Sequence, residues 1–384
     1  MKRKRILYII NVPWGWIKQR PHFLAKNLSD YYDVTVFERT YYNSFFKKNK
    51  QLVNNIKTET EFFRINEYRT WSFEKIPLLK KYRLDDKINK LLIKYKYRYI
   101  IDEYDIVWFG SPFLYHLWGD YLSTSKTVIY DCMDDYLSFP SINKNHVLKN
   151  IINNAEKKLI NRADLVIFSS EYLRNQVHKR HGISKKSIVI NNAIEMPNNE
   201  GSKSLVADKI KSLSRPIVYI GTIAEWFDYE IMISLLNSHK DLNLVLIGPL
   251  SSSNINHPQI HYMGPVVHNE IFSIMKVAYA LIMPFKINEL ILSVNPVKLY
   301  EYIYSGKPVI SVRYAETEKF EDYVYLYNDF EELDKIMKNI KDNSNDEVYI
   351  QKCLSFVEKN TWQERVKQIS RELNKDIKVF GINL

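Results

Sequence analysis

Short, continuous apolar runs that alternate with amphipathic stretches constrain this chain more than any other feature. A run without polar alternation predicts a strand that is covered on both faces. Strands of this kind, separated by stretches of helical period, predict layered α/β domains with parallel sheets. The runs are RILYII (5–10), VTVF (34–37), DIVWFG (105–110), TVIY (127–130), LVIF (165–168), IVI (188–190), IVYIG (217–221), LVLIG (244–248) and ALIMPF (280–285).

The pattern occurs twice, with a polar break at 191–216 that carries Pro197 and Gly201 and predicts a linker near 195–212. The chain has 384 residues, which suits two domains of about 150–200 residues better than one core. We expect two tandem Rossmann-like, doubly wound domains facing a central cleft, with ligand sites at the carboxyl ends of the strands. The expected domains are residues 1–200 and 201–360, followed by a final helix, 361–384, that packs back on the first domain.

The sequence favours a cytoplasmic protein. The two cysteines, Cys132 and Cys353, lie far apart, which excludes a disulfide framework or zinc-ligand spacing and fits a reducing compartment. The first apolar run ends at Pro13 without a small-residue cleavage site, so it predicts a buried strand rather than a signal peptide. No apolar run is long enough to span a bilayer.

The net charge of +11 is uneven, since residues 1–200 hold 34 Lys and Arg against 21 Asp and Glu. Residues 64–99 contribute 11 of these cations, interleaved with Trp71, Phe73 and many tyrosines. Cations beside aromatic side chains suit the headgroup layer of an anionic membrane. A solvated helix pair is the next interpretation, and nucleic-acid binding is the last because no nucleic-acid motif accompanies the charge.

The stretch SVNPVKLYEYIYSGKPVISV (293–312) predicts a helix that Asn295 caps, that Pro296 opens and that ends at Gly306. The free N–H groups at its start, near Val297, can bind phosphate. Glu301, further along the helix, could accept hydrogen bonds from both hydroxyls of a ribose, and Lys298 on the same face could neutralise phosphate charge. The alternative is a surface i,i+3 ion pair of little energetic weight.

PVKLYEYIYSGKPVI resembles the carboxyl-domain signature of GT-B glycosyltransferases, especially the retaining family 4 enzymes of bacterial envelope and exopolysaccharide synthesis. The blocks IVYIGTIAEWFDYEIMISLL, LNLVLIGP and ALIMPFKINEL extend the resemblance. It implies a GT-B fold, a UDP- or GDP-linked sugar donor, Glu301 at the ribose, retention of anomeric configuration and no need for a metal or other cofactor. Many family members carry a second Glu where this chain has Ser293, so the contact to the donor sugar differs here.

Further donor-site candidates follow strands of the second half. Gly221 and Thr222 come after a strand, where the resemblance implies the donor diphosphate or sugar; a simple turn is the alternative. Asp228 is expected at the next helix start, where it could equally be a cap. Lys286 is a candidate phosphate partner or a solvated lysine.

The first half offers residues for the acceptor side. Trp14, Gly15 and Trp16 follow the first strand, in a loop that lines the cleft of GT-B enzymes, so the two rings could stack on a sugar or lipid-linked acceptor or simply close the strand end. Arg20 lies at a predicted helix start, where the dipole disfavours a cation. We therefore expect Arg20 to interact with an anion.

YDCMDDY (130–136) follows a buried strand and holds Asp131, Asp134 and Asp135. A carboxylate here could deprotonate an acceptor hydroxyl; a helix cap with surface charge is the alternative for each. Relatives often carry a His-Asp pair at this point, and Met133 replaces the His. Any acid-base or orienting role would fall to one of the three aspartates.

The resulting hypothesis is a glycosyltransferase that moves a sugar to a hydroxyl of a glycan or polyprenyl-linked acceptor in cell-surface polysaccharide synthesis, at the inner face of the plasma membrane. A sugar-nucleotide epimerase of the same fold is the alternative enzyme. A non-catalytic nucleotide-binding scaffold is conceivable because of Ser293 and Met133.

Overall fold

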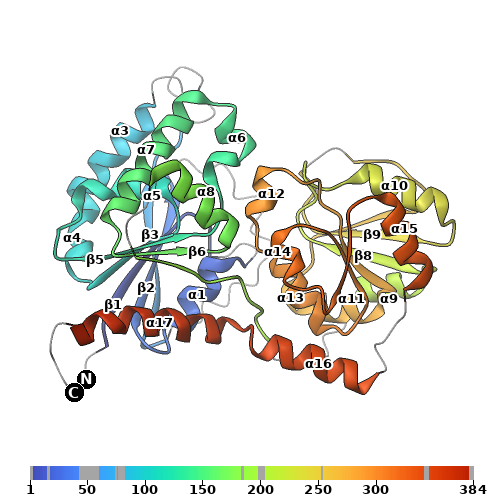
Figure 1. Ribbon diagram of the computed structural model, residues 1–384. Coiled ribbons are helices and arrows are strands. Elements are labelled where there is room, and N and C mark those ends of the chain that lie inside the picture. Colours follow the sequence, from blue (N-terminus) through green and yellow to red (C-terminus); the bar gives the residue numbers. More distant parts are fainter. Residues whose placement is uncertain are drawn as a thin grey trace. The chain divides into compact units, whose positions relative to one another are not determined.

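The structure is a computed structural model that describes residues 3–14, 18–42, 60–73, 76, 83–182, 186–197, 204–251, 254–340 and 346–379. The chain divides into two compact units (Figure 1). Unit 1 comprises Met1–Asn191 with Arg365–Leu384, and unit 2 comprises Asn192–Glu364.

Unit 1 is built on a seven-stranded sheet of order β3-β2-β1-β4-β5-β6-β7. Every neighbouring pair of strands is parallel. The strands are β1 (Arg5–Ile10), β2 (Asp33–Tyr41), β3 (Phe63–Thr70), β4 (Ile106–Phe109), β5 (Thr127–Cys132), β6 (Leu165–Phe168) and β7 (Ser187–Val189).

Helices cover both faces of this sheet, as a doubly wound domain requires. In Figure 1, α5, α7 and α8 lie on one face, and α1 and α17 lie on the other. The Lys186 ammonium donates to the backbone carbonyl of Glu372 in α17 at 3.0 Å, which ties this helix to the end of the sheet. The helices are α1 (Arg20–Leu28), α3 (Leu84–Leu92), the π-helix η2 (Ile93–Tyr97), α4 (Arg98–Asp102), α5 (Pro112–Trp118), η3 (Gly119–Tyr121), η4 (Tyr136–Ser138), α6 (Pro140–Asn143), α7 (His146–Arg162), α8 (Glu171–His181) and α17 (Trp362–Val379).

Unit 2 has a six-stranded parallel sheet of order β10-β9-β8-β11-β12-β13. Its strands are β8 (Pro216–Ile220), β9 (Asn243–Ile247), β10 (Ile260–Gly264), β11 (Ala280–Met283), β12 (Val309–Val312) and β13 (Val324–Tyr327). Its helices are α9 (Leu205–Lys211), α10 (Tyr229–Ser238), η5 (His268–Glu270), α11 (Ile271–Val277), α12 (Glu289–Ser293), α13 (Val297–Tyr304), α14 (Ala315–Glu318), α15 (Phe330–Asn339) and α16 (Glu347–Glu358).

The predicted fold class is confirmed, because both units have the strand order of a doubly wound Rossmann-like sheet. Each predicted apolar run lies in or overlaps a strand, and β1, β4, β6, β8 and β11 are almost wholly buried. The strand order changes direction between β1 and β4 in unit 1, and between β8 and β11 in unit 2, because later strands are added on the opposite side of the first strand. Ligands of such sheets bind at the carboxyl ends of the strands beside this reversal.

One part of the basic segment 64–99 differs from the helix-pair interpretation. Residues Phe63–Thr70 form β3, an edge strand whose buried and exposed positions mostly alternate. A strand with one face in water does not show a continuous apolar run, so the search for such runs did not find β3. Helical structure follows only from Leu84 onward in the described residues.

Candidate functional site

The carboxyl ends of β8 and β9 approach each other very closely. The backbone N–H of Gly221 donates to the carbonyl of Ile247 at 2.8 Å. A Cβ placed on Gly248 would lie 2.1 Å from the carbonyl oxygen of Gly221, and Gly248 has a φ of +138°. Only glycine fits position 248 without displacing this backbone. The Gly221–Thr222 turn is further fixed by the Tyr219 hydroxyl, which donates to the Thr222 carbonyl at 2.9 Å.

Asp228 caps helix α10, which is the structural one of its two predicted roles. Its carboxylate accepts hydrogen bonds from the backbone N–H groups of Glu230 and Ile231 at 3.1 and 3.2 Å. The Lys286 ammonium donates to the exposed carboxylate of Glu230 at 2.9 Å. Both candidate donor-site residues therefore have local structural partners at the edge of the sheet where β11 ends.

Helix α13 begins at Val297, with Pro296 as the residue before its first turn. The prediction that Asn295 caps this helix is wrong, because the Asn295 side chain is used elsewhere. Its amide oxygen accepts from the backbone N–H of Asn192 at 2.8 Å, and its amide nitrogen donates to Glu316 at 2.9 Å. Asn295 is buried and anchors the segment before the helix. The helix ends as predicted, with Gly306 in the left-handed conformation at a φ of +70°.

Glu301 is the one acidic residue of helix α13, and its pKa is strongly perturbed. Its side chain is only 4% exposed. One carboxylate oxygen accepts from Lys298 Nζ at 2.8 Å, and the other accepts from His268 Nε2 at 3.1 Å. Burial raises the pKa of Glu301, but the Lys298 charge and the His268 hydrogen bond outweigh it and lower the pKa to about 2. Glu301 is therefore ionised at neutral pH and acts only as an acceptor.

Lys298 and Glu301 do form an i,i+3 ion pair, but it is not the exposed surface pair that was the alternative to a ligand role. The carboxylate is buried, whereas the Lys298 and His268 side chains are 32% and 26% exposed. A carboxylate offers about four lone-pair positions on its two oxygens. With one donor on each oxygen from these residues, Glu301 retains acceptor capacity on both oxygens for neighbouring hydroxyl groups.

Ser293 ends helix α12, and its hydroxyl donates to the carbonyl of Leu290 at 2.7 Å. The side chain is buried, at 1% exposure for the residue. The position where the family resemblance leads one to expect a second Glu therefore holds a short side chain bonded to its own helix.

In unit 1, Arg20 and Asp131 form a buried ion pair. Arg20 Nη2 lies 2.9 Å from Asp131 Oδ1, and its Nε donates to the same carboxylate. The Tyr8 hydroxyl adds a hydrogen bond at 3.2 Å. The anion that Arg20 was expected to interact with is therefore an internal carboxylate. This geometry argues against Asp131 as a base, since a base must be free to take a proton from substrate.

Asp135 is also occupied. Arg180 Nη2 donates to both of its oxygens at 2.9 Å, and the Ser138 hydroxyl donates at 2.7 Å. Asp135 also caps the short helix η4. Arg180 in turn donates to Glu156, which is fully buried. Arg180 and Glu156 could not be identified from the sequence, because nothing local in α8 or α7 marks them.

Asp134 is the aspartate that these two arginines leave without a partner. Its carboxylate makes no hydrogen bond or ion pair with any residue in the described part of the chain. Burial, assisted by the charges of Asp131 and Asp135, raises its pKa to about 6 against the opposing charge of Arg20. A carboxyl group that titrates near neutrality is suited to accept a proton.

The Trp14 ring packs at 4.9 Å from the His22 ring of α1 and 5.2 Å from the ring of Phe63, the first residue of β3. His22 accepts from the backbone of Gln19 and contacts the Pro13 carbonyl. Burial lowers the pKa of His22 to about 4, which keeps it neutral. Gly15 and Trp16 lie outside the described residues.

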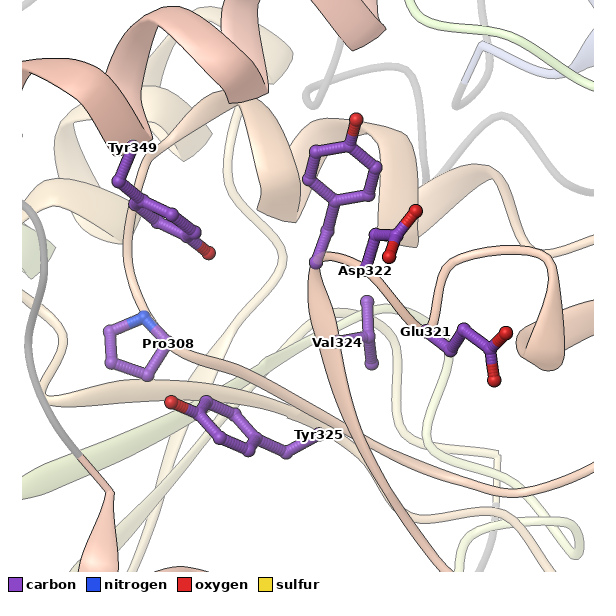
Figure 2. Close-up of a pocket in the computed structure, with 7 residues that line it drawn as sticks. Pro308, Glu321, Asp322, Val324, Tyr325 and Tyr349 are labelled. Atoms are coloured by element: carbon purple, nitrogen blue, oxygen red, sulfur yellow. The ribbon is translucent and has the colours of Figure 1, made fainter.

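A cavity of about 170 Å³ in unit 2 lies elsewhere (Figure 2). Pro308, Val324, Tyr325 and Tyr349 are among its lining residues. Pro308 and Val324 mark the amino ends of β12 and β13, whereas the donor-site candidates follow carboxyl ends. The two locations are therefore at opposite edges of the sheet. Within the described residues, no group of three or more His, Cys, Asp or Glu side chains is arranged to hold a metal ion.

No protein-family profile matches the chain. A curated relative, "Putative teichuronic acid biosynthesis glycosyltransferase TuaH" of Bacillus subtilis (strain 168), is 27% identical over 215 residues. This match spans about half of each protein, 52% of this chain and 54% of the relative.

Solved structures match nearly the whole chain. The E. coli trehalose-6-phosphate protein bound with UDP-2-fluoro glucose aligns with a TM-score of 0.70 at 10% identity, over 96% of this chain and 99% of that one. Anabaena Alr3699/HepE with UDP and glucose has a TM-score of 0.62 at 13% identity, over 96% and 99%. Sucrose-phosphate synthase of Thermosynechococcus elongatus has a TM-score of 0.66 at 12% identity, over 98% and 100%. Together with the strand order of both sheets, these likenesses show that the chain has the GT-B glycosyltransferase fold.

Proposed function

We propose that this chain is a glycosyltransferase that moves a sugar from a nucleotide-linked donor to a hydroxyl of a glycan or lipid-linked acceptor in cell-surface polysaccharide biosynthesis. The shared fold and the similarity to TuaH support this activity. The observation that carries it is the environment of Glu301, a buried, ionised carboxylate whose two oxygens each retain acceptor capacity. Such a group fits the paired hydroxyls of a ribose.

The start of α13 and Lys298 are the proposed partners of the donor diphosphate. Backbone N–H groups at a helix start and a nearby ammonium both favour a negatively charged group. UDP is the first nucleotide to test because it is bound in the HepE structure. We also assign Gly221 and Thr222 to the donor side, since they follow β8 beside the reversal of the sheet.

Transfer breaks the bond between the anomeric carbon and the phosphate oxygen, and the electron pair leaves with the nucleoside diphosphate. The acceptor oxygen forms the new bond to the anomeric carbon, and its proton must be removed. Asp134 is the proposed proton acceptor, because its pKa is raised and its carboxylate has no hydrogen-bond or ion-pair partner among the residues that the structure describes. The family resemblance implies retention of configuration, and no protein nucleophile is assigned. Stabilising the leaving diphosphate through fixed N–H groups and Lys298 requires no metal ion.

We further propose that unit 1 binds the surface of an anionic membrane through α3, η2 and α4. Four large apolar or aromatic side chains on these helices are exposed: Leu84 38%, Leu91 54%, Tyr95 69% and Tyr99 58%. Their spacing of about two, one and one helical turns indicates one side of this helical segment. The exposed Lys94 lies 5.3 Å from the Tyr95 ring, and Arg98 lies 4.8 Å from the Tyr99 ring. Cations and aromatic rings together suit the headgroup layer.

This attachment is peripheral in the proposal. Within the described residues, no helix combines the length and the apolar character needed to cross a bilayer. An acceptor on a lipid carrier would lie at the same surface, which would bring the acceptor hydroxyl to the enzyme.

Thermal unfolding with a panel of nucleotides and nucleotide-sugars tests the donor assignment, because a ligand that binds only the folded state raises the unfolding temperature. A stabilising donor is then incubated with candidate acceptors, and products are separated by mass spectrometry. A new glycoside supports the transferase. Isomerised donor without acceptor would indicate an epimerase, nucleotide binding without turnover would indicate a scaffold, and absence of any stabilisation would contradict the proposal.

A further inference from the structure

His268 reaches the proposed nucleotide site from a different element than Glu301. It opens η5, in the connection that follows β10, whereas Glu301 lies in α13. Its Nε2 nevertheless lies 3.1 Å from Glu301 Oε1. The His268 ring packs edge-on against Phe272, with ring centroids 5.9 Å apart and an angle of 83° between the planes. An imidazole held by an aromatic neighbour offers a hydrogen-bond donor in a defined direction.

The two hydrogen-bond donors to Glu301, Lys298 and His268, differ in how far they fix the orientation of its carboxylate. Lys298 carries a point charge on a flexible stem, so it neutralises the carboxylate without strongly directing it. His268 is a rigid ring, and its contact with one oxygen restricts rotation of the carboxylate about the last side-chain bond. With both donors in place, one acceptor position on each oxygen is defined for an incoming group.

We infer that His268 is a positioning residue of the nucleotide site, which holds the Glu301 carboxylate so that it accepts both hydroxyls of a ribose. The inference rests on the proposed function and deepens it by naming a determinant of selectivity for ribonucleotides. A carboxylate held in this orientation distinguishes a ribose from a 2′-deoxyribose, because the deoxy sugar leaves one acceptor position without its donor. Both the imidazolium and the neutral Nε2–H tautomer can donate this bond, so the role does not require a charged ring.

The test compares the Kd values of UDP and dUDP, or of GDP and dGDP if guanine binds better, by calorimetry. The wild-type protein should prefer the ribonucleotide by about tenfold or more, since a hydrogen bond to a charged group contributes about 1.5–3 kcal/mol. His268→Ala should reduce this preference to about threefold or less. His268→Gln, which keeps an amide N–H near the position of Nε2, should preserve most of the preference.

Two further variants separate positioning from general damage. His261→Ala removes a histidine of β10 that contacts Asn243 at 2.8 Å and not Glu301, so its preference should match the wild type. In a Glu301→Ala background, His268→Ala should cause no further loss of preference, because the two residues act as one unit.

The outcomes distinguish the inference from the proposed function. Wild-type protein that binds none of these nucleotides overturns the function and the inference together. If Glu301→Ala loses the ribose preference and His268→Ala keeps it, only the inference falls. Equal weakening of UDP and dUDP by His268→Ala, with the preference intact, would assign a merely structural role to His268 and would also overturn the inference.

Discussion

Arg20 and Asp131 are separated by 111 positions in the sequence and form a buried ion pair. Their side chains are 3% and 0% exposed, and Arg20 also donates to the Ile190 carbonyl at 2.8 Å. The two contacts of Arg20 therefore join the start of α1 to the end of β5 and to the residue after β7. This arrangement fixes the carboxyl edge of the unit 1 sheet, beside the loop that carries Asp134.

Arg20→Ala should destabilise the protein by about 3–5 kcal/mol, because it leaves the Asp131 charge buried without a partner. Urea denaturation measures the change. Arg174→Ala is the matched control, since Arg174 pairs with Glu171 on the surface at 35% and 48% exposure, where such a pair contributes about 1 kcal/mol or less. Equal effects of the two substitutions would show that the Arg20 pair does not support the fold.

Asp134→Asn should lower transfer by about 10²–10⁴-fold if this carboxylate takes the acceptor proton, while UDP binding stays unchanged. In the wild type, kcat/KM should rise with pH through about 6, where the Asp134 pKa lies. A rate that is flat across this range, together with an active Asp134→Asn variant, would remove Asp134 from the mechanism.

The same substitution should stabilise the fold at pH 8. The folded-state pKa of Asp134 is raised from 3.8 to about 6, so the folded protein binds the proton more tightly than the unfolded chain does. The free energy of unfolding therefore falls as pH rises between these values, and the cost is fully present above pH 6. Asp134→Asn removes this cost, and its advantage in unfolding temperature over the wild type should disappear below about pH 4. A variant that is less stable than the wild type at pH 8 would contradict this assignment.

Gly248→Ala should be strongly destabilising, by about 2 kcal/mol or more, since its Cβ would lie 2.1 Å from the Gly221 carbonyl oxygen. Gly264→Ala is the control. Gly264 has a φ of +72°, yet no atom lies within 4 Å of its added Cβ, so only the backbone cost of about 1–2 kcal/mol applies. Chemical denaturation should show the larger loss for Gly248, and equal losses would contradict the close approach of the two turns.

Reversing the charges of Lys94 and Arg98 to Glu should abolish binding to vesicles of anionic lipid, since each cation near such a surface contributes about 1 kcal/mol. The control replaces Lys209 and Lys211, on α9 of unit 2, by Glu, which changes the net charge by the same amount. Sedimentation with vesicles at low and high salt measures the effect. Loss of binding in both variants, or in neither, would contradict a docking surface on α3, η2 and α4.

The fold could be predicted because buried parallel strands are continuous apolar runs, as in β1, β8 and β11. Local spacing also gave the contact of Lys298 with Glu301 as the alternative to a ligand role, since the two lie three residues apart on one helix face. Edge strand β3 was missed because its exposure largely alternates, so its apolar residues form no run.

Long-range partners could not be predicted. Asn295 has the residue type and position of a helix cap, but contacts with Asn192 and Glu316 compete successfully for its side chain. Arg20 and Asp131 were each identified, but nothing local indicated that each is the other's partner. His268 carried no signal in the sequence, since strand β10 before it is only partly buried and forms no apolar run, and its contact with Glu301 spans 33 positions.

The most direct test of the account is the affinity of UDP and GDP for the Glu301→Ala protein, measured by calorimetry on a variant shown to be folded. Glu318→Ala, which removes an exposed carboxylate of α14, is the control. Glu301→Ala should weaken binding of the better-bound nucleotide by more than tenfold, about 1.4 kcal/mol, and the control should bind it like the wild type. Unchanged affinity in folded Glu301→Ala protein would contradict the assignment of the ribose to this carboxylate.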